Sequence, residues 1–141
     1  MPTRPFCRQI LSAFALALAS PVLPGHGAFA ADAPPRSVWE GVYTEAQAAQ
    51  GEKQYQQICQ RCHGTDTRAG EEVSLWGDEF WKSWREDTLD NLYHYVSANM
   101  PNDEPATLRT EQYLDVIAYV LKKNDLPAGA ARLTVASATG V

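Results

Sequence analysis

The sequence is poor in the sulfur-containing residues and carries few basic side chains. Three cysteines and two methionines occur in 141 residues, and three cysteines are too few for the disulfide framework of a small secreted domain. Lys and Arg number 12 against 17 Asp and Glu, a net charge of −5. The clustered positive charge that binds nucleic acid is therefore missing. Charged residues at 21% and hydrophobic residues at 45% are typical of a globular domain and exclude a disordered or polytopic membrane protein.

The most apolar stretch of the chain is shorter than the ~20 residues that are needed to cross a bilayer. Residues 10–18 follow Arg4 and Arg8 and precede an Ala-x-Ala sequence at residues 28–30. A basic start, a short apolar run and such a site are typical of a secretory signal peptide. We therefore expect residues 1–30 to be cleaved, which makes the protein periplasmic without a membrane span and, with two arginines removed, changes its net charge to −7. An uncleaved N-terminal anchor is the alternative.

Sustained alternation of apolar and polar residues, the signature of strands, is missing as well. We predict an all-α domain over residues 38–129, preceded by a flexible leader at residues 31–37 and followed by a mobile tail at residues 130–141. About four short helices are expected. They cover residues 45–58 after the cap Thr44, residues 78–84, a segment that follows Asp87 or Thr88 and ends before Pro101, and about residues 110–124. A domain this small often depends on a cofactor for part of its stability.

Two of the few cysteines lie three residues apart and are followed directly by a histidine. Cys59, Cys62 and His63 form a C-x-x-C-H sequence, which is the attachment site of a c-type haem. At the end of a helix, residues i and i+3 point the same way, so both thiols can bond to the vinyl groups of one porphyrin while the histidine faces the iron. We predict one haem c, bound covalently through Cys59 and Cys62, with His63 as an axial ligand.

Two other kinds of site use paired cysteines. A thioredoxin-like redox pair lies in a βαβ unit, and no strand pattern is visible here. A structural zinc site needs four ligands, and His94 is the one histidine after residue 30 besides His63. Both are weaker interpretations than haem attachment.

One methionine follows residue 30, and it lies in a loop. Met100 precedes Pro101, which favours an extended backbone suited to a loop laid across the far face of a haem. A core-filling role is the alternative, but a polar loop is a poor place for it. We predict Met100 as the second axial ligand. His94 lies off the apolar stripe of its helix and is the weaker candidate.

The whole pattern resembles a small class I cytochrome c. The resemblance rests on Gly51 and Tyr55 ahead of the motif, on Met100 with its proline, and on residues 115–119 of the last helix. In that family the glycine of the first helix crosses an aromatic residue of the last helix, here Tyr119. The flanking residues resemble those of bacterial cytochrome c domains that accompany or are fused to pyrroloquinoline-quinone-dependent dehydrogenases; they are residues 39–44, residues 80–84, Leu108, Tyr113 and residues 126–129.

The resemblance implies a monohaem carrier that passes one electron from a dehydrogenase, with a quinoprotein as a candidate, to an acceptor or oxidase. It implies redox proteins as partners and no enzymatic activity; a haem enzyme or gas sensor with a labile distal ligand is the alternative. It also places the carbonyl acceptor for the proximal histidine in the loop around Leu75. Partners should dock where the haem edge is exposed, around residues 60–61 and 100–102, at an edge that carries Arg61 and few acids.

Overall fold

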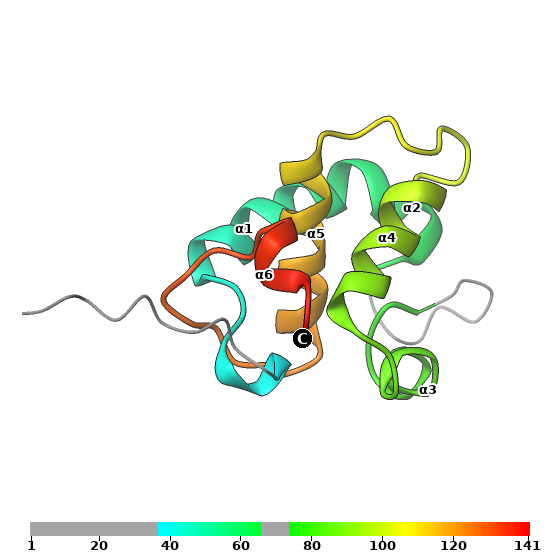
Figure 1. Ribbon diagram of the computed structural model, residues 1–141. Coiled ribbons are helices and arrows are strands. Elements are labelled where there is room, and N and C mark those ends of the chain that lie inside the picture. Colours follow the sequence, from blue (N-terminus) through cyan, green and yellow to red (C-terminus); the bar gives the residue numbers. More distant parts are fainter. Residues whose placement is uncertain (1–36, 66–73) are drawn as a thin grey trace, which may run out of the picture. The chain divides into compact units, whose positions relative to one another are not determined.

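The structure is a computed structural model that describes residues 37–65 and 74–141. All regular elements in these two ranges are helical, as predicted (Figure 1). In chain order they are a 3₁₀ turn η1 (Val38–Glu40), α1 (Glu45–Gln54), a π-helical turn η2 (Tyr55–Cys59), α2 (Gln60–His63), α3 (Asp78–Trp84), α4 (Leu89–Asn99), α5 (Thr110–Lys123) and α6 (Val135–Ala138). The predicted signal peptide and nearly all of the predicted leader lie outside the described residues. No helix within the described ranges is long and apolar enough to span a membrane.

Side-chain caps determine where α1 and α4 begin. Thr44 Oγ1 accepts a hydrogen bond from the Gln47 amide at 3.2 Å, and Thr88 Oγ1 accepts one from the Asn91 amide at 3.1 Å. Each bond satisfies one of the amides that the start of a helix leaves without a backbone partner. The Gln47 side chain is buried and bonds to Leu133 instead, so the spacing after Thr44 produces a cap but no capping box.

Helices α1 and α5 cross in direct backbone contact at Gly51. A Cβ atom at this position would lie 1.7 Å from the Asp115 carbonyl oxygen and 3.0 Å from Tyr119 Cβ. The predicted contact between Gly51 and Tyr119 is therefore confirmed, and the backbone of Asp115 lies closer still. Glycine weakens a helix interior by about 1 kcal/mol relative to alanine, but here only glycine lets the two helices approach.

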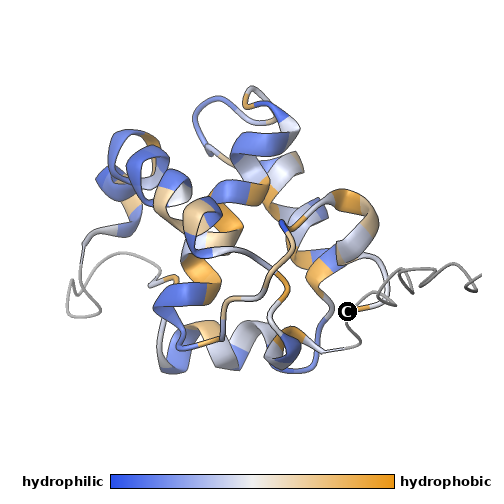
Figure 2. Ribbon diagram, turned by 90° about the vertical axis from the view of Figure 1, so that its left-hand side faces the viewer, coloured by the Kyte–Doolittle hydropathy of each residue, from blue (hydrophilic) through white to orange (hydrophobic). Residues whose placement is uncertain are grey.

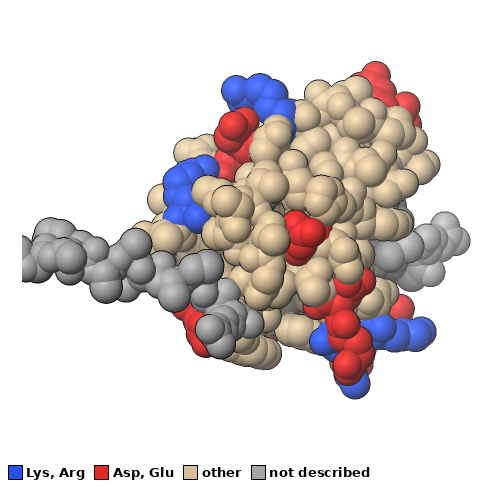
Figure 3. Space-filling view, viewed as in Figure 1, with Lys and Arg blue, Asp and Glu red and all other residues tan. Residues whose placement is uncertain are grey.

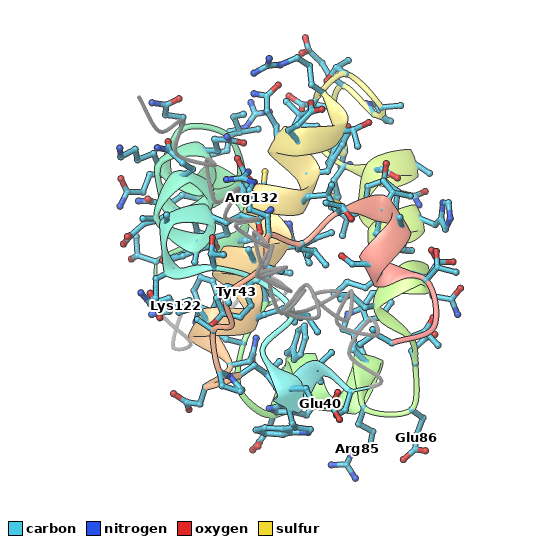
Figure 4. All side chains as sticks on the ribbon, turned by 60° about the vertical axis from the view of Figure 1, so that its left-hand side comes forward. Glu40, Tyr43, Arg85, Glu86, Lys122 and Arg132 are labelled. Atoms are coloured by element: carbon cyan, nitrogen blue, oxygen red, sulfur yellow. The ribbon has the colours of Figure 1, made fainter. Side chains whose placement is uncertain are left out.

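Two ion pairs link α5 to other parts of the chain. Lys122 of α5 pairs with Glu45 at the start of α1. Arg132, which follows α5, donates to Asp115 Oδ1 at 2.8 Å. In Figure 4 the labelled side chains of Lys122 and Arg132 both lie along α5.

The core collects around α5 and an aromatic cluster beside it. Eight residues of α5 are buried, which are Tyr113, Leu114, Asp115, Val116, Ile117, Ala118, Val120 and Leu121. The ring of Trp76 lies 5.4 Å from that of Tyr55 and 6.4 Å from that of Tyr119, measured between centroids. Figure 2 shows the hydrophobic segments gathered toward the middle of the domain and the hydrophilic ones outside.

Two glycines bring the segment before α1 against the segment after α5. The Gly129 amide donates to the Tyr43 carbonyl at 2.6 Å, and the Tyr43 hydroxyl donates to the Leu126 carbonyl at 2.7 Å. A Cβ atom at Gly129 would lie 1.9 Å from the Gly41 carbonyl oxygen, and Gly41 itself has a φ of +79°. Both positions therefore require glycine as the structure stands. Figure 4 shows Tyr43 beside α5.

Residues 130–141 differ from the predicted mobile tail. The Leu133 side chain is 2% exposed; the Leu133 amide donates to Gln47 Oε1 at 2.7 Å, and its carbonyl accepts from Gln47 Nε2 at 3.0 Å. The Val141 carbonyl accepts from the Leu89 amide at 2.8 Å. The expectation of a tail is therefore corrected. It was wrong because one apolar residue among small ones has no helical or strand periodicity.

Candidate functional site

An apolar cavity of about 430 Å³ lies beside α5, between the segment of the C-x-x-C-H motif and α4. Its volume is in the range of cofactor sites. The lining includes all four predicted site residues, Cys59, Cys62, His63 and Met100. Most of the remaining lining side chains are hydrophobic, namely Ile58, Leu75, Phe80, Trp84, Leu92, Tyr95, Val96, Pro101, Val116, Ile117 and Val120.

The motif is presented by one continuous helical stretch with a π-helical turn inside it. The Gln60 amide donates to the Tyr55 carbonyl, five residues back, which inserts one extra residue into that turn. Such turns occur frequently at functional sites. The sequence predicted one helix from Glu45 to Ile58 with Gly51 inside it, and a pattern based on 3.6 residues per turn could not have revealed the insertion.

Cys59 is half-buried and Cys62 is exposed, and the two do not form a disulfide with each other. Burial, followed by the proximity of Cys62, raises the pKa of the Cys59 thiol to about 11, although Arg61 acts in the opposite direction. A thioredoxin-like pair needs a lowered thiol pKa, so this environment does not suit that alternative. Nor do the described residues contain a group of three or more His, Cys, Asp or Glu that could hold a metal ion, as the zinc alternative would need.

Tyr55 holds the backbone directly after the motif histidine. Its ring is 1% exposed, and its hydroxyl donates to the Gly64 carbonyl at 2.8 Å. The Gly64 amide in turn donates to the Gln60 carbonyl at 2.8 Å. Residues on both sides of His63 are thereby fixed. Tyr55 was one of the residues on which the resemblance to class I cytochromes c rested, but nothing in the sequence revealed which group its hydroxyl bonds to.

Leu75 lines the cavity, as His63 does. The Leu75 carbonyl accepts from Asn124 Nδ2 at 3.0 Å, and the Trp76 carbonyl accepts from Ser74 Oγ at 3.0 Å. Asn124 is buried and fastens the loop around Leu75 to the end of α5. The predicted acceptor for the histidine ring in this loop remains a prediction.

Met100 directly follows α4 and has the extended backbone predicted from its proline, with φ −118° and ψ 150°. Its amide donates to the Val96 carbonyl at 3.0 Å, and its carbonyl accepts from the Tyr113 hydroxyl at 2.8 Å. The weaker candidate His94 is not among the residues that line the cavity. Its side chain is 65% exposed and its Nε2 lies 3.6 Å from a carboxylate oxygen of Asp90.

Arg61, expected as a positive charge at an edge with few acids, is paired with an acid. Its Nη2 donates to Asp103 Oδ1 at 2.6 Å, and both side chains are 54% exposed. The hydrogen bond between them raises the pKa of Arg61 and lowers the pKa of Asp103. Asp103 follows Met100 by three residues, so the ion pair joins the two walls of the cavity at its rim.

The family comparison agrees with this geometry. Residues 46–120 match the family model described as Cytochrome C oxidase, cbb3-type, subunit III. The chain belongs to this family of c-type cytochrome domains. The cofactor of the cytochrome domain is haem c, for which Cys59 and Cys62 have the attachment spacing. Such domains are typically electron carriers with redox proteins as partners. No curated protein and no solved structure matches the chain.

The residues of the cytochrome domain fit haem c. The cavity offers an apolar wall to the porphyrin and the two motif cysteines within the same lining. It also offers an imidazole nitrogen and a thioether sulfur from two separate segments, His63 and Met100, which are common axial ligands of cytochromes c.

Proposed function

We propose that this cytochrome domain is a periplasmic carrier of single electrons in which His63 and Met100 are the axial ligands of haem c. The observation that supports this proposal is that both residues line one apolar cavity together with the two motif cysteines. When bound, haem c supplies an iron that accepts one electron and releases it again. The thioether of Met100 is a soft donor that favours the reduced iron and so raises the potential relative to two histidine ligands.

The cavity wall adds to this effect and keeps water away. Phe80, Leu92 and Ile117 line the cavity and are at most 7% exposed. An apolar wall disfavours the additional charge of the oxidised state, which again raises the potential. A haem enzyme of the peroxidase kind needs a distal histidine or arginine, but among the described lining residues the one histidine is His63 and the one arginine, Arg61, bonds to Asp103.

We further propose that the electron donor is a dehydrogenase, with a quinoprotein as the candidate, and that an acceptor or oxidase lies downstream. The support is the resemblance of residues 39–44 and 126–129 to the domains that accompany such dehydrogenases. These two segments lie against each other through the hydrogen bond between Gly129 and Tyr43, so this part of the resemblance forms one region. Export rests on residues 1–30, which lie outside the described residues.

The ultraviolet and visible spectrum of the purified ferric holoprotein tests the proposal. We expect a six-coordinate, low-spin haem with a weak sulfur-to-iron charge-transfer band in the far red. A high-spin spectrum would contradict the carrier and favour the haem enzyme or the gas sensor. A low-spin spectrum without the far-red band would contradict Met100 as a ligand, and His94→Ala would then test the remaining candidate.

A further inference from the structure

The distal segment, residues 100–108, runs from the end of α4 toward the start of α5 (Figure 1). One buried side chain contacts both of its ends. The Tyr113 hydroxyl donates to the Met100 carbonyl at 2.8 Å and accepts from the Leu108 amide at 3.2 Å. Tyr113 lies near the start of α5 and is 4% exposed.

We propose that Tyr113 is a positioning residue for Met100, whose hydroxyl fixes both ends of the distal segment to α5 and so keeps the thioether at the cavity. This inference rests on the proposed function, in which Met100 is an axial ligand. A single hydroxyl used as both donor and acceptor couples the two ends. Movement of Met100 away from the cavity therefore strains two hydrogen bonds at once.

The rest of the distal segment offers little else to hold it in place. Residues 102–107 are exposed, so no buried side chain anchors the middle of the segment. The Glu104 amide bonds to the Pro101 carbonyl at 3.0 Å, and the Thr107 hydroxyl bonds to the Glu104 carbonyl at 2.7 Å. These bonds shape the segment but do not attach it to the domain.

Besides the bond from the Met100 amide to Val96, the segment is attached by the ion pair of Asp103 with Arg61, in which both side chains are 54% exposed. Exposed pairs of this kind contribute little and are screened by salt. A buried hydroxyl is different, because its removal leaves backbone groups without their partner. The Tyr113 hydroxyl therefore holds the distal segment more strongly than the ion pair does.

The test is Tyr113→Phe, which removes the hydroxyl and keeps the ring. Tyr43→Phe is the matched control, because Tyr43 is 1% exposed and its hydroxyl also donates to a backbone carbonyl, that of Leu126, at 2.7 Å. Unlike Met100, the partner of Tyr113, Leu126 does not line the cavity. Imidazole should bind ferric Tyr113→Phe about tenfold more tightly than wild type, equivalent to about 1.4 kcal/mol. The far-red band should weaken and the reduction potential should fall.

The control should lose unfolding stability but keep the wild-type imidazole affinity, band and potential. If Tyr113→Phe and Tyr43→Phe behave alike in these three measurements, the proposal is overturned. Failure of the proposed function looks different, because the wild-type protein itself would then lack the far-red band. In a Met100→Ala background, Tyr113→Phe should no longer alter imidazole affinity; a persisting tenfold effect would also overturn the proposal.

If Tyr113→Phe does not take up haem, amide exchange in the wild-type holoprotein answers the same question. The Leu108 amide should exchange slowly while Met100 is bound, because it donates to the Tyr113 hydroxyl. Saturating imidazole, which displaces Met100, should accelerate that exchange several-fold. Exchange at Leu108 that does not respond to imidazole would contradict the coupling.

Discussion

The two walls of the cavity are held in place by different kinds of interaction. On the motif side, Cys59, Cys62 and His63 belong to one helical stretch, so their relative positions follow from the local backbone. Across the cavity, Met100 lies on an extended segment whose place depends on contacts from elsewhere in the chain, above all with Tyr113. Changes in tertiary packing should therefore disturb the distal side first.

Replacement of both motif cysteines should abolish the covalent attachment of haem. In the variant with Cys59→Ser and Cys62→Ser, no thioether can form, so the denatured protein should retain no haem. Haem-dependent peroxidase staining of a denaturing gel should be strong for wild type and absent for the variant. Extraction of haem from wild type into acidified organic solvent would show that the attachment is not covalent.

Gly51→Ala should displace both walls together, because α1 leads into the motif and α5 follows the distal segment. The new Cβ would overlap the Asp115 carbonyl, and neither backbone can move without separating the two helices. We expect the free energy of unfolding to fall by ~3 kcal/mol, measured by urea denaturation of the holoprotein. Gln50→Ala, at an exposed neighbouring position, is the control and should change it little. Equal stability of the two variants would contradict the close crossing.

Met100→Ala should affect only the distal side. The soft donor is lost while the covalent attachment and His63 remain, so the reduction potential should fall and the iron should bind imidazole or cyanide more readily. Circular dichroism should show that the helices persist. Unchanged affinity for these ligands would mean that Met100 does not occupy the axial position.

Asp103→Asn should have a much smaller effect at the distal side. It removes the ion pair that joins the walls at the rim, but the pair is exposed and the Tyr113 contacts remain. Imidazole affinity should rise only slightly at low salt, and the difference from wild type should vanish in high salt because screening weakens the pair in wild type as well. An effect as large as that of Tyr113→Phe would mean that the ion pair holds the distal segment as strongly as the Tyr113 hydroxyl does.

The weakest expected effect concerns partner docking at the rim between the walls. The protein is acidic overall, but acidic and basic side chains lie scattered on the face seen in Figure 3, where uncharged surface predominates. Charge should therefore increase the association rate of a basic redox partner more than its affinity. Second-order electron-transfer rates measured by stopped flow should fall moderately as ionic strength rises. Rates that stay constant or increase would favour docking through apolar contacts.

The features that the sequence predicted well have local signals. The motif residues are contiguous, the caps Thr44 and Thr88 act within three residues of themselves, and α3 has the predicted bounds of residues 78–84. The apolar spacing in the last helix indicated α5 to within one residue of its end. The resemblance to a cytochrome c added the crossing at Gly51.

What the sequence missed depends on partners far along the chain. Gln47 and Leu133 are 86 residues apart, and Arg61 and Asp103 are 42 apart. Tyr113 was noted as a residue of the resemblance, but its dual hydrogen bonding is a property of how the distal segment closes on α5. No periodicity or spacing encodes which distant backbone group a buried hydroxyl or amide will meet.

The contact between Gly41 and Gly129 has a consequence for how this sequence can change over generations. Each glycine leaves room for the other's backbone, so an added side chain at either one must push the two segments apart. Once they are apart, a change at Gly129 would be less damaging than it is alone, so the two effects should not add. Gly41 is constrained independently by its positive φ. Among related sequences we therefore expect the two positions to covary, with Gly129 replaced only where Gly41 and its surroundings have already shifted.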